Sequence, residues 1–378
     1  MISQRLSDYL AELHEWVSIE TPSADREAVA RLLHRVAARC TEAGLAVEWA
    51  GGGDGACPTL LARSSPAPLS QGILVLAHVD TVHAKGTLES RLPWRIKGDR
   101  LYGPGVYDMK GSALMALAAW RQLAETGRSS KVPVTFLFSP DEEIGSPSSR
   151  EVIEREARNA LAALVVEPAR DGGRIVISRK GVARFVITAT GRAAHAGVNF
   201  ELGRSAISEI AAQIPLLDGL TDIADGITVN VGTISGGTGP NTVAEHCRVE
   251  VDVRLQRMEQ VEPVLGAIRS LKPRNPDIKL EITGELNRPP FDHDTGSQAL
   301  FRHARAVAAE LGIDLVGVST GGASDGNFTA AMGIPTLDGL GVDGAGAHTL
   351  EEYILLSSVV PRIDLFTRLL ERTDPGAF

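Results

Sequence analysis

The sequence predicts an α/β protein in which a mostly parallel sheet is covered by helices and interrupted by an inserted ferredoxin-like domain. Short apolar runs alternate with helical patterns in both outer parts of the chain, which is typical of a parallel sheet. Near Lys180 the order changes to βαββαβ, the order of a ferredoxin-like unit, and after Arg288 the α/β pattern returns. We therefore expect one outer domain made of residues 1–179 and 289–378, and an inserted domain over residues 180–288.

The length and charge of the chain narrow the classes of protein to consider. Its 378 residues suggest two domains. A net charge of −9 argues against nucleic acid or an anionic membrane as a partner, and no apolar run approaches the length of a membrane span. The three cysteines stand far apart and suggest neither a disulfide framework nor a thiolate zinc site. Because residues 1–9 lack the hydrophobic core of a signal peptide, we expect a soluble cytoplasmic protein.

The outer domain is expected to begin with two amphipathic helices, at residues 3–17 and 24–43. Pro22 separates these helices, and Ser23 is positioned to cap the second one. The other elements expected in this domain are strands at 72–77, 132–138, 162–166 and 313–318, and helices at 112–125, 147–158, 294–311 and 351–372. The inserted domain is expected to contain strands at 184–190, 226–234, 246–255 and 278–286, and helices at 202–217 and 258–271.

Acidic residues and histidine follow the buried-type strands of the outer domain. His78 and Asp80 come directly after the first apolar run, Asp141-Glu142-Glu143 after the second, and Glu167 after the third. Asp108 lies in a glycine-rich loop just before an alanine-rich helix. The carboxyl ends of parallel strands meet at one edge of a sheet, where ligands bind. So many carboxylates in one place repel one another unless cations neutralise them.

The number and type of these residues fit a site for two metal ions. Such a site needs a bridging carboxylate, separate ligands for each ion and a free carboxylate as a base. Asp108 is the candidate bridge and Glu142 the candidate base, and Asp80 is placed to accept the second ring N–H of His78. The expected pairs of separate ligands are His78 with Glu167, and Glu143 with His348.

Each of these features has a simpler explanation when it is taken alone. A His-x-Asp pair is usually a pair of surface polar groups, and acidic residues after a strand often begin a solvated helix. His348 and His195 lie in glycine-containing loops, where histidines are often merely exposed. The glycine-rich loop lacks both the GxGxxG spacing and the lysine of a phosphate-binding loop, which argues against a nucleotide-dependent enzyme. The metal hypothesis therefore depends on the conjunction of all these sites at one edge.

Five motifs, taken in order, resemble those of the M20 family of zinc peptidases and deacylases. They are His78-Val79-Asp80, Tyr102-Gly103-Pro104-Gly105 with Asp108-Met109-Lys110-Gly111, Asp141-Glu142-Glu143-Ile144-Gly145, Glu167-Pro168 and His348. The glutamate carboxypeptidase branch, also called carboxypeptidase G, is the most similar. Residues 17–23 and 321–325 extend the resemblance over nearly the whole chain.

The resemblance implies a role for each metal-site residue. Asp108 would bridge two zinc ions, with His78 and Glu167 completing one site and Glu143 and His348 the other. Glu142 would act as general base and then general acid, Asp80 would orient His78, and the Asp108–Met109 peptide would be cis. Co²⁺ or Mn²⁺ would also suit so carboxylate-rich a site.

The resemblance also implies that the outer domain is the zinc-dependent catalytic domain and that the insert is a lid through which a homodimer forms. His195 would reach a neighbouring subunit's site and polarise the scissile carbonyl. Asn241 would hold the substrate, and Arg288 would bind its terminal carboxylate, although Arg288 also reads as a surface residue near a domain junction. Arg174 lies near the position of a basic residue that binds a glutamate side chain. By the same resemblance, Gly322 and Ala323 would belong to the substrate pocket, where Ala323 replaces a glycine of the carboxypeptidase G pattern.

The function expected from these residues is metal-dependent hydrolysis of an amide bond by a zinc-activated water, with Glu142 as general base. The substrate would be a small peptide or an N-acyl amino acid, and the product a C-terminal amino acid such as glutamate. One alternative is an N-acyl amino acid deacylase of the acetylornithine or succinyl-diaminopimelate type, which would use the same catalytic residues. A second alternative is a non-catalytic binding protein on the same fold.

Overall fold

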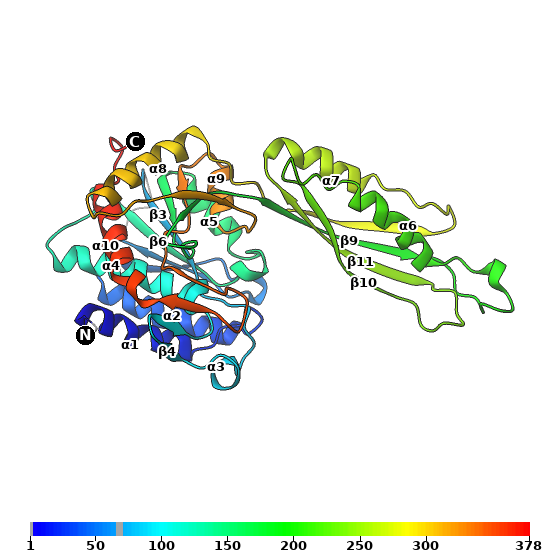
Figure 1. Cartoon of the computed structure of the whole chain (residues 1–378), viewed down its shortest axis with the longest axis horizontal. Coiled ribbons are helices and arrows are strands. Elements are labelled where there is room, and N and C mark those ends of the chain that lie inside the picture. The colour runs from blue at the N-terminus through cyan, green and yellow to red at the C-terminus, as the bar shows by residue number, and fades with distance from the viewer. Residues whose placement is uncertain (1–2, 66–70) are drawn as a thin grey trace. The chain divides into compact units, whose positions relative to one another are not determined.

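The computed structural model describes residues 3–65 and 71–378, which form two compact units (Figure 1). Unit 1 comprises the chain as far as Ser178, together with His293–Thr320 and Ser324–Phe378. Unit 2 comprises Arg179–Asp292 and Gly321–Ala323. Among the described residues, no helix is both long and apolar enough to cross a membrane.

Unit 1 is built on a six-stranded sheet. In spatial order its strands are β1 (Ala46–Ala50), β2 (Thr59–Arg63), β6 (Val134–Ser139), β3 (Gly72–His78), β7 (Ala160–Val165) and β14 (Thr336–Leu337). The neighbouring strands from β6 to β14 are parallel to one another. The β1–β2 and β2–β6 pairs are antiparallel. This arrangement confirms the predicted mostly parallel sheet. The sequence analysis did not identify β1 and β2.

Helices cover both faces of this sheet because apolar side chains of the central strand point alternately to each side. Ile73 and Val75 face the larger core, and Leu74 and Leu76 face a smaller one. The larger core is covered by α1 (Gln4–Ser18), α2 (Arg26–Glu42), α4 (Gly111–Glu125), α8 (Thr295–Ala309) and α10 (Leu356–Arg372). The smaller core is covered by α5 (Arg150–Ala157) and α9 (Gly326–Ala331). The short helix α3 (Thr87–Ser90) lies between β3 and the next strand of the chain.

Two small sheets complete the strands of unit 1. One is antiparallel and contains, in spatial order, β15 (Gly344–Ala345), β16 (Tyr353–Leu355), β5 (Arg100–Tyr102) and β4 (Arg95–Lys97). The other pairs β8 (Ile175–Arg179) with β13 (Gly317–Thr320). The four-stranded sheet matters for the site, because it brings the chain around residue 350 beside the loop that follows β5.

Unit 2 is a four-stranded antiparallel sheet with two helices. In spatial order the strands are β10 (Thr228–Gly236), β11 (His246–Leu255), β9 (Gly181–Thr190) and β12 (Lys279–Arg288). The helices α6 (Ala206–Asp218) and α7 (Val261–Arg269) lie along one face of the sheet (Figure 1), where they pack on apolar residues such as Phe185 and Val249. The chain order βαββαβ and the antiparallel pairing confirm the predicted ferredoxin-like architecture.

Several local predictions differ from the structure in their bounds or in their capping residue, and the helix predicted at residues 202–217, for example, begins at Ala206. The strand predicted at residues 313–318 is β13, which begins only at Gly317, because its partner β8 pairs with this later segment. The last helix begins at Leu356 rather than at 351, since the preceding residues form β16 against β5. The second helix is capped by Asp25, whose carboxylate accepts from the N–H of Ala28 at 3.0 Å. Ser23 is not the cap, and its hydroxyl makes a different contact that is described below.

Candidate metal centre

His78 is the last residue of β3 and its imidazole is almost completely buried, with 1% exposed. Its Nε2 atom lies 3.2 Å from Oδ1 of Asp108 and 3.6 Å from Oε1 of Glu167. Its Nδ1 atom lies 3.0 Å from the main-chain oxygen of Asp80 and 3.4 Å from the carboxylate of the same residue. The nearer acceptor is the carbonyl, which therefore directs Nε2 toward the acidic side chains.

Asp108 faces two imidazoles from opposite oxygens of one carboxylate. Oδ1 contacts His78, and Oδ2 lies 3.3 Å from Nε2 of His348. The residue lies in the irregular turn Val106–Lys110, just ahead of α4, and the peptide between Asp108 and Met109 is cis. A carboxylate with its two oxygens divided between two donors has the geometry that a bridging ligand needs.

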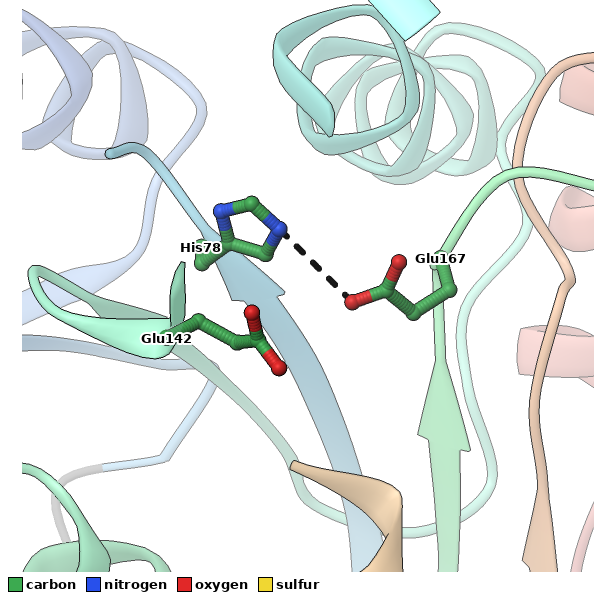
Figure 2. Close-up of side chains that lie close together, drawn as sticks. All are labelled: His78, Glu142 and Glu167. Atoms are coloured by element: carbon green, nitrogen blue, oxygen red, sulfur yellow. Dashed lines mark ion pairs between the residues drawn. The ribbon is translucent and has the colours of Figure 1, made fainter. Parts of the chain in front are cut away.

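The turn Glu142–Ile144 follows β6 and carries two neighbouring glutamates, both of which approach His78. Glu142 approaches His78 and Glu167, and one ligand atom from each of these three residues lies within 4.8 Å of the others. Figure 2 shows the three side chains directed toward one another, with the ion pair between His78 and Glu167 drawn. The carboxylate of Glu143 forms a similar group with His78 and Asp108, and it also lies 3.1 Å from Nε2 of His348.

The carboxylate of Asp80 holds this turn in place. Its Oδ1 accepts from the main-chain N–H of Glu142 at 3.1 Å, and its Oδ2 accepts from that of Glu143 at 3.2 Å. Oδ2 also accepts from the hydroxyl of Ser23 at 2.6 Å. Asp80 is completely buried, so these contacts stabilise its charge and fix the backbone from which both glutamates project.

The pKa values in the cluster show how strongly it attracts positive charge. Burial alone would lower the pKa of His78, but hydrogen bonds to Asp108 and the other nearby carboxylates raise it well above its ordinary value. Hydrogen bonds to Asp108 and Glu143 raise the pKa of His348 to about 10. Burial raises the pKa of Asp108, yet the two imidazoles outweigh it and hold that pKa well below its usual range.

The donor set fits divalent cations. It offers two imidazoles and four carboxylates, which are ligands that zinc accepts and that Co²⁺ and Mn²⁺ also tolerate. Within the described chain, Oε1 of Glu143 is buried and has no hydrogen-bond partner, while Oε2 faces His348. Burial and the charge of Asp108 also raise the pKa of Glu143. A cation would satisfy that oxygen and offset the repulsion between the two carboxylates.

In unit 2 the structure places His195 and Asn241 on paired segments. The N–H of Ala196 donates to the main-chain oxygen of Asn241 at 2.9 Å, and His195 forms a β-bridge with Thr242. Both His195 and Asn241 are exposed. The N–H of Gly197 donates to Nδ1 of His195 at 3.1 Å, so that Nε2 carries the ring proton of the neutral imidazole and is available as a donor.

The remaining predicted substrate residues have different surroundings. Arg288 is the last residue of β12 and is buried, with 3% exposed, and its Nη1 lies 3.4 Å from the side-chain oxygen of Asn287. Arg174 lies in unit 1, where its exposed side chain contacts Asp171 through the main-chain oxygen at 2.9 Å. Gly322 accepts from Arg179 at 3.2 Å, and Ala323 follows it in the segment of unit 2 formed by residues 321–323.

The sequence analysis missed two residues that support the metal donors. Ser23 was read as a helix cap, whereas its hydroxyl binds the carboxylate of Asp80. No sequence pattern distinguished Glu352, yet it is buried and accepts hydrogen bonds from the loop that carries Asp108. The only sequence signal for Ser23 was its place in a stretch that resembles the M20 family, and Glu352 is preceded by another glutamate with no pattern to distinguish the two.

Comparison with known proteins identifies the family. The chain matches peptidase family M20/M25/M40 over residues 74–372. It is 30% identical over 380 residues to carboxypeptidase G2 of Pseudomonas sp. (strain RS-16), with 97% of this chain and 88% of that protein covered. The chain therefore belongs to peptidase family M20. It is a metallopeptidase similar to carboxypeptidase G2, as its motifs predicted.

Two solved structures share its fold, each with a TM-score of 0.76. One is aminopeptidase PepT from Bacillus cereus, at 21% identity, with 97% of this chain and 98% of that chain covered. The other is the M20 family metallo-carboxypeptidase Sso-CP2 from Sulfolobus solfataricus, at 19% identity, with 96% of this chain and 98% of that chain covered.

Proposed function

We propose that this protein is a carboxypeptidase that binds two zinc ions and releases a C-terminal amino acid, with glutamate the first candidate. Its substrate would be a small peptide or an N-acyl amino acid with a free terminal carboxylate. The observation that carries the proposal is the position of Asp108. Its two oxygens face two imidazoles, and each imidazole also faces a glutamate of its own.

This arrangement supports a division of the donors between two ions. His78 and Glu167 would serve one ion, Glu143 and His348 the other, and Asp108 both. Bound ions would lower the pKa of a coordinated water to about 7 and polarise the scissile carbonyl. The assignment leaves Glu142 without a ligand's role, although its carboxylate lies beside His78 and Glu167.

Glu142 would act as the general base and then as the general acid. It would take a proton from the attacking water and deliver that proton to the nitrogen of the leaving amine. Support comes from its position in the turn beside Glu143, where Asp80 fixes the backbone of both residues through their N–H groups. A general base needs this kind of fixed position, because proton transfer depends on hydrogen-bond distance.

Residues of unit 2 would recognise the substrate. His195 would donate from Nε2 to the carbonyl oxygen as negative charge develops there, and the proton position set by Gly197 supports that role. Asn241 would bind the substrate beside it, and Arg288 would pair with the terminal carboxylate through its two-pronged guanidinium. We further propose that unit 2 is the lid and that it mediates a homodimer in which His195 acts on the neighbouring subunit.

A matched substrate panel tests the carboxypeptidase assignment. The purified chain, loaded with zinc or with cobalt, is assayed on an N-acyl-glutamate, on the C-terminal amide of the same compound, on N-acetylornithine and on N-succinyl-diaminopimelate. We expect hydrolysis of the N-acyl-glutamate and little hydrolysis of its amide, because the amide lacks the charge that Arg288 would bind.

Two outcomes of this panel, and one outcome of a separate chelation experiment, would contradict the proposal. Equal rates on acid and amide would remove the need for a terminal carboxylate. A strong preference for N-acetylornithine or N-succinyl-diaminopimelate would make the protein a deacylase instead. Full activity after removal of all metal by a chelator would show that no metal ion is required. As the positive control, activity lost to the chelator should return when zinc is added.

A further inference from the structure

Glu352 is a buried carboxylate that the proposed mechanism does not use. Its side chain lies against the loop that carries Asp108 and accepts three main-chain hydrogen bonds from it. Oε1 accepts from the N–H of Tyr107 at 2.8 Å and from that of Asp108 at 3.0 Å. Oε2 accepts from the N–H of Gly105 at 3.0 Å. One side chain therefore satisfies three of the backbone donors of this loop, including that of Asp108 itself.

The loop needs such an acceptor because it is not a regular helix. Asp108 has φ −115° and ψ 95°, far from helical values, and Gly105 has φ +74°, in the left-handed region. Backbone N–H groups in an irregular buried segment have no regular hydrogen-bond ladder, and leaving them unpaired is costly. Regular helical hydrogen bonding begins only with α4, at Gly111. Ahead of it, Glu352 supplies an acceptor for the N–H groups of the loop.

The second oxygen of Glu352 also faces a buried histidine. Nε2 of His83 lies 2.5 Å from Oε2, and both side chains are buried, with 9% of His83 exposed. His83 comes from the segment after β3, whereas Glu352 comes from the C-terminal part of the chain. The pair therefore joins the segment that follows His78 to the loop that carries Asp108.

Glu352 also stands close in sequence to the other proposed ligand of the second ion. It lies four residues after His348 and directly before β16, which pairs with both β15 and β5. His348 itself has φ +64°, an uncommon value for a residue other than glycine, so its turn depends on the surrounding contacts. A displacement of Glu352 would therefore shift the backbone of both His348 and Asp108.

We propose that Glu352, supported by His83, is the positioning residue that sets the distance between Asp108 and His348, and hence the affinity of the second metal site. The residue would touch neither metal nor substrate, and would act through the backbone of the ligands. The inference rests on the proposed function, because it needs two ions shared through Asp108. It adds an anchor for the bridging aspartate that none of the motifs contains.

The test compares Glu352→Gln with a matched control, Glu156→Gln. Glu156 is also a buried carboxylate of unit 1. It lies on α5, outside the donor cluster, and its Oε2 is 2.7 Å from Nη1 of Arg63. Glutamine has one acceptor oxygen, so Glu352→Gln must lose either the hydrogen bond from Gly105 or those from Tyr107 and Asp108. Zinc chloride is titrated into metal-stripped full-length protein in a calorimeter, and the melting temperature, kcat and KM are measured on each variant.

We expect Glu352→Gln to bind the weaker zinc ion about tenfold less tightly or worse, which is the loss typical of residues that orient metal ligands. Its kcat should fall while KM stays near the wild-type value. Glu156→Gln should lower the melting temperature without changing zinc affinity. If Glu352→Gln proves too unstable to purify, His83→Gln tests the same anchor from the other side, and it should show the same selective loss of the weaker ion.

Two negative results are distinguishable. If the wild type binds no second zinc ion, the two-metal function fails and the inference fails with it. If the wild type binds two ions and Glu352→Gln binds both with wild-type affinity, the two-metal function stands and the positioning role is refuted. A loss of melting temperature equal to that of Glu156→Gln, with unchanged zinc binding, would likewise reduce Glu352 to a structural residue.

Discussion

The metal donors of unit 1 and the candidate substrate residues of unit 2 are held in place in different ways. His78 and Asp80 are buried, and the carboxylate of Asp80 makes three hydrogen bonds to other segments. His195 and Asn241 are exposed, and the bonds that order them run mainly between the backbones of their two loops. The first set is fixed largely through side chains, and the second largely through the backbone, with one further hydrogen bond from the N–H of Gly197 to the His195 ring.

This difference separates two kinds of function. The metal donors other than His348 are mostly buried and must hold charge at fixed distances, so a change of one of these ligands alters the cation that the cluster can bind. Exposed residues on paired loops can meet a substrate without disturbing the donors. Substitutions of the metal donors in unit 1 should therefore change metal content together with kcat, whereas substitutions of His195 and Asn241 in unit 2 should change catalysis and leave metal content intact.

Asp108→Asn should have the largest effect. Asparagine keeps one acceptor oxygen, so one of the two imidazoles loses its carboxylate partner. We expect loss of at least one metal ion per chain and activity close to background, measured by elemental analysis and by turnover on the same preparation.

The control for this variant comes from unit 2. Asp252→Asn also removes a carboxylate charge, in this case one that pairs with Arg254 on β11 at 2.6 Å. It should leave both metal content and kcat near wild-type values. If Asp108→Asn kept its full metal content, Asp108 would not be the bridge and the assignment of the donors would be wrong.

Glu142→Gln should come next, and it separates chemistry from metal binding within unit 1. Glutamine keeps the size of the side chain but cannot take a proton, so kcat should fall about a hundredfold to ten-thousandfold. The metal content should stay at the wild-type value, since Glu142 is not a required ligand in the proposed assignment. Parallel loss of metal would instead make Glu142 a ligand, which its position beside His78 and Glu167 also permits.

The sequence predicted much of unit 1 because its signals are local. The central strands β3, β6 and β7 are largely apolar runs, His78 is the last residue of the first of them, and Glu142 lies just beyond the second. The chemistry of acidic groups at one sheet edge then made the donor set recognisable from the sequence alone. The ferredoxin-like order of unit 2 was equally clear from its alternating strands and helices.

The features that were missed depend on contacts between distant segments. The hydroxyl of Ser23 fits a helix cap locally, and only the approach of Asp80 shows where it binds. Glu352 lies 244 residues from Asp108, with no periodicity that separates it from the exposed Glu351. The short strands β15 and β16 were missed for the same reason, because they exist through pairing with each other and with β5.

His195→Ala should reduce kcat about a hundredfold to a thousandfold, the usual effect of losing one donor to a developing oxyanion, with no loss of metal. It also tests whether His195 acts on the neighbouring subunit. His195→Ala and Glu142→Gln proteins are mixed, and subunit exchange is verified by mass spectrometry. Half of the dimers formed by random exchange are mixed, and each has one intact site if the histidine acts across the dimer. Activity should then return to about a quarter of the wild-type value.

The mixing experiment has a clear negative result. If His195 serves its own chain, every site in a mixed dimer carries one of the two lesions, and activity stays at the level of the separate variants. A protein that is monomeric at the assay concentration would exclude the dimer altogether. Loss of metal in His195→Ala would contradict the separation between the two units.

Ser23→Ala should have the smallest effect and shows how firmly the donor cluster is fixed. The variant removes the hydroxyl that donates to Oδ2 of Asp80, but the N–H groups of Glu142 and Glu143 still bind that carboxylate. Ser23 also lines a pocket of about 520 Å³, from which water can replace the lost donor. We expect unchanged metal content, a decrease of about 1 kcal/mol in the free energy of unfolding and a loss in kcat of less than about tenfold.

Ser23→Thr is the matched variant, because threonine keeps the hydroxyl while adding a methyl group. It should retain wild-type kcat if the hydrogen bond to Asp80 is what matters at this position. A loss in Ser23→Ala as large as that in Glu142→Gln would show that the remaining contacts of Asp80 do not hold the turn. The donors of unit 1 would then depend on single contacts as much as the exposed loops of unit 2 do. The contrast between the two units would fail at Asp80, the residue with three hydrogen bonds to other segments.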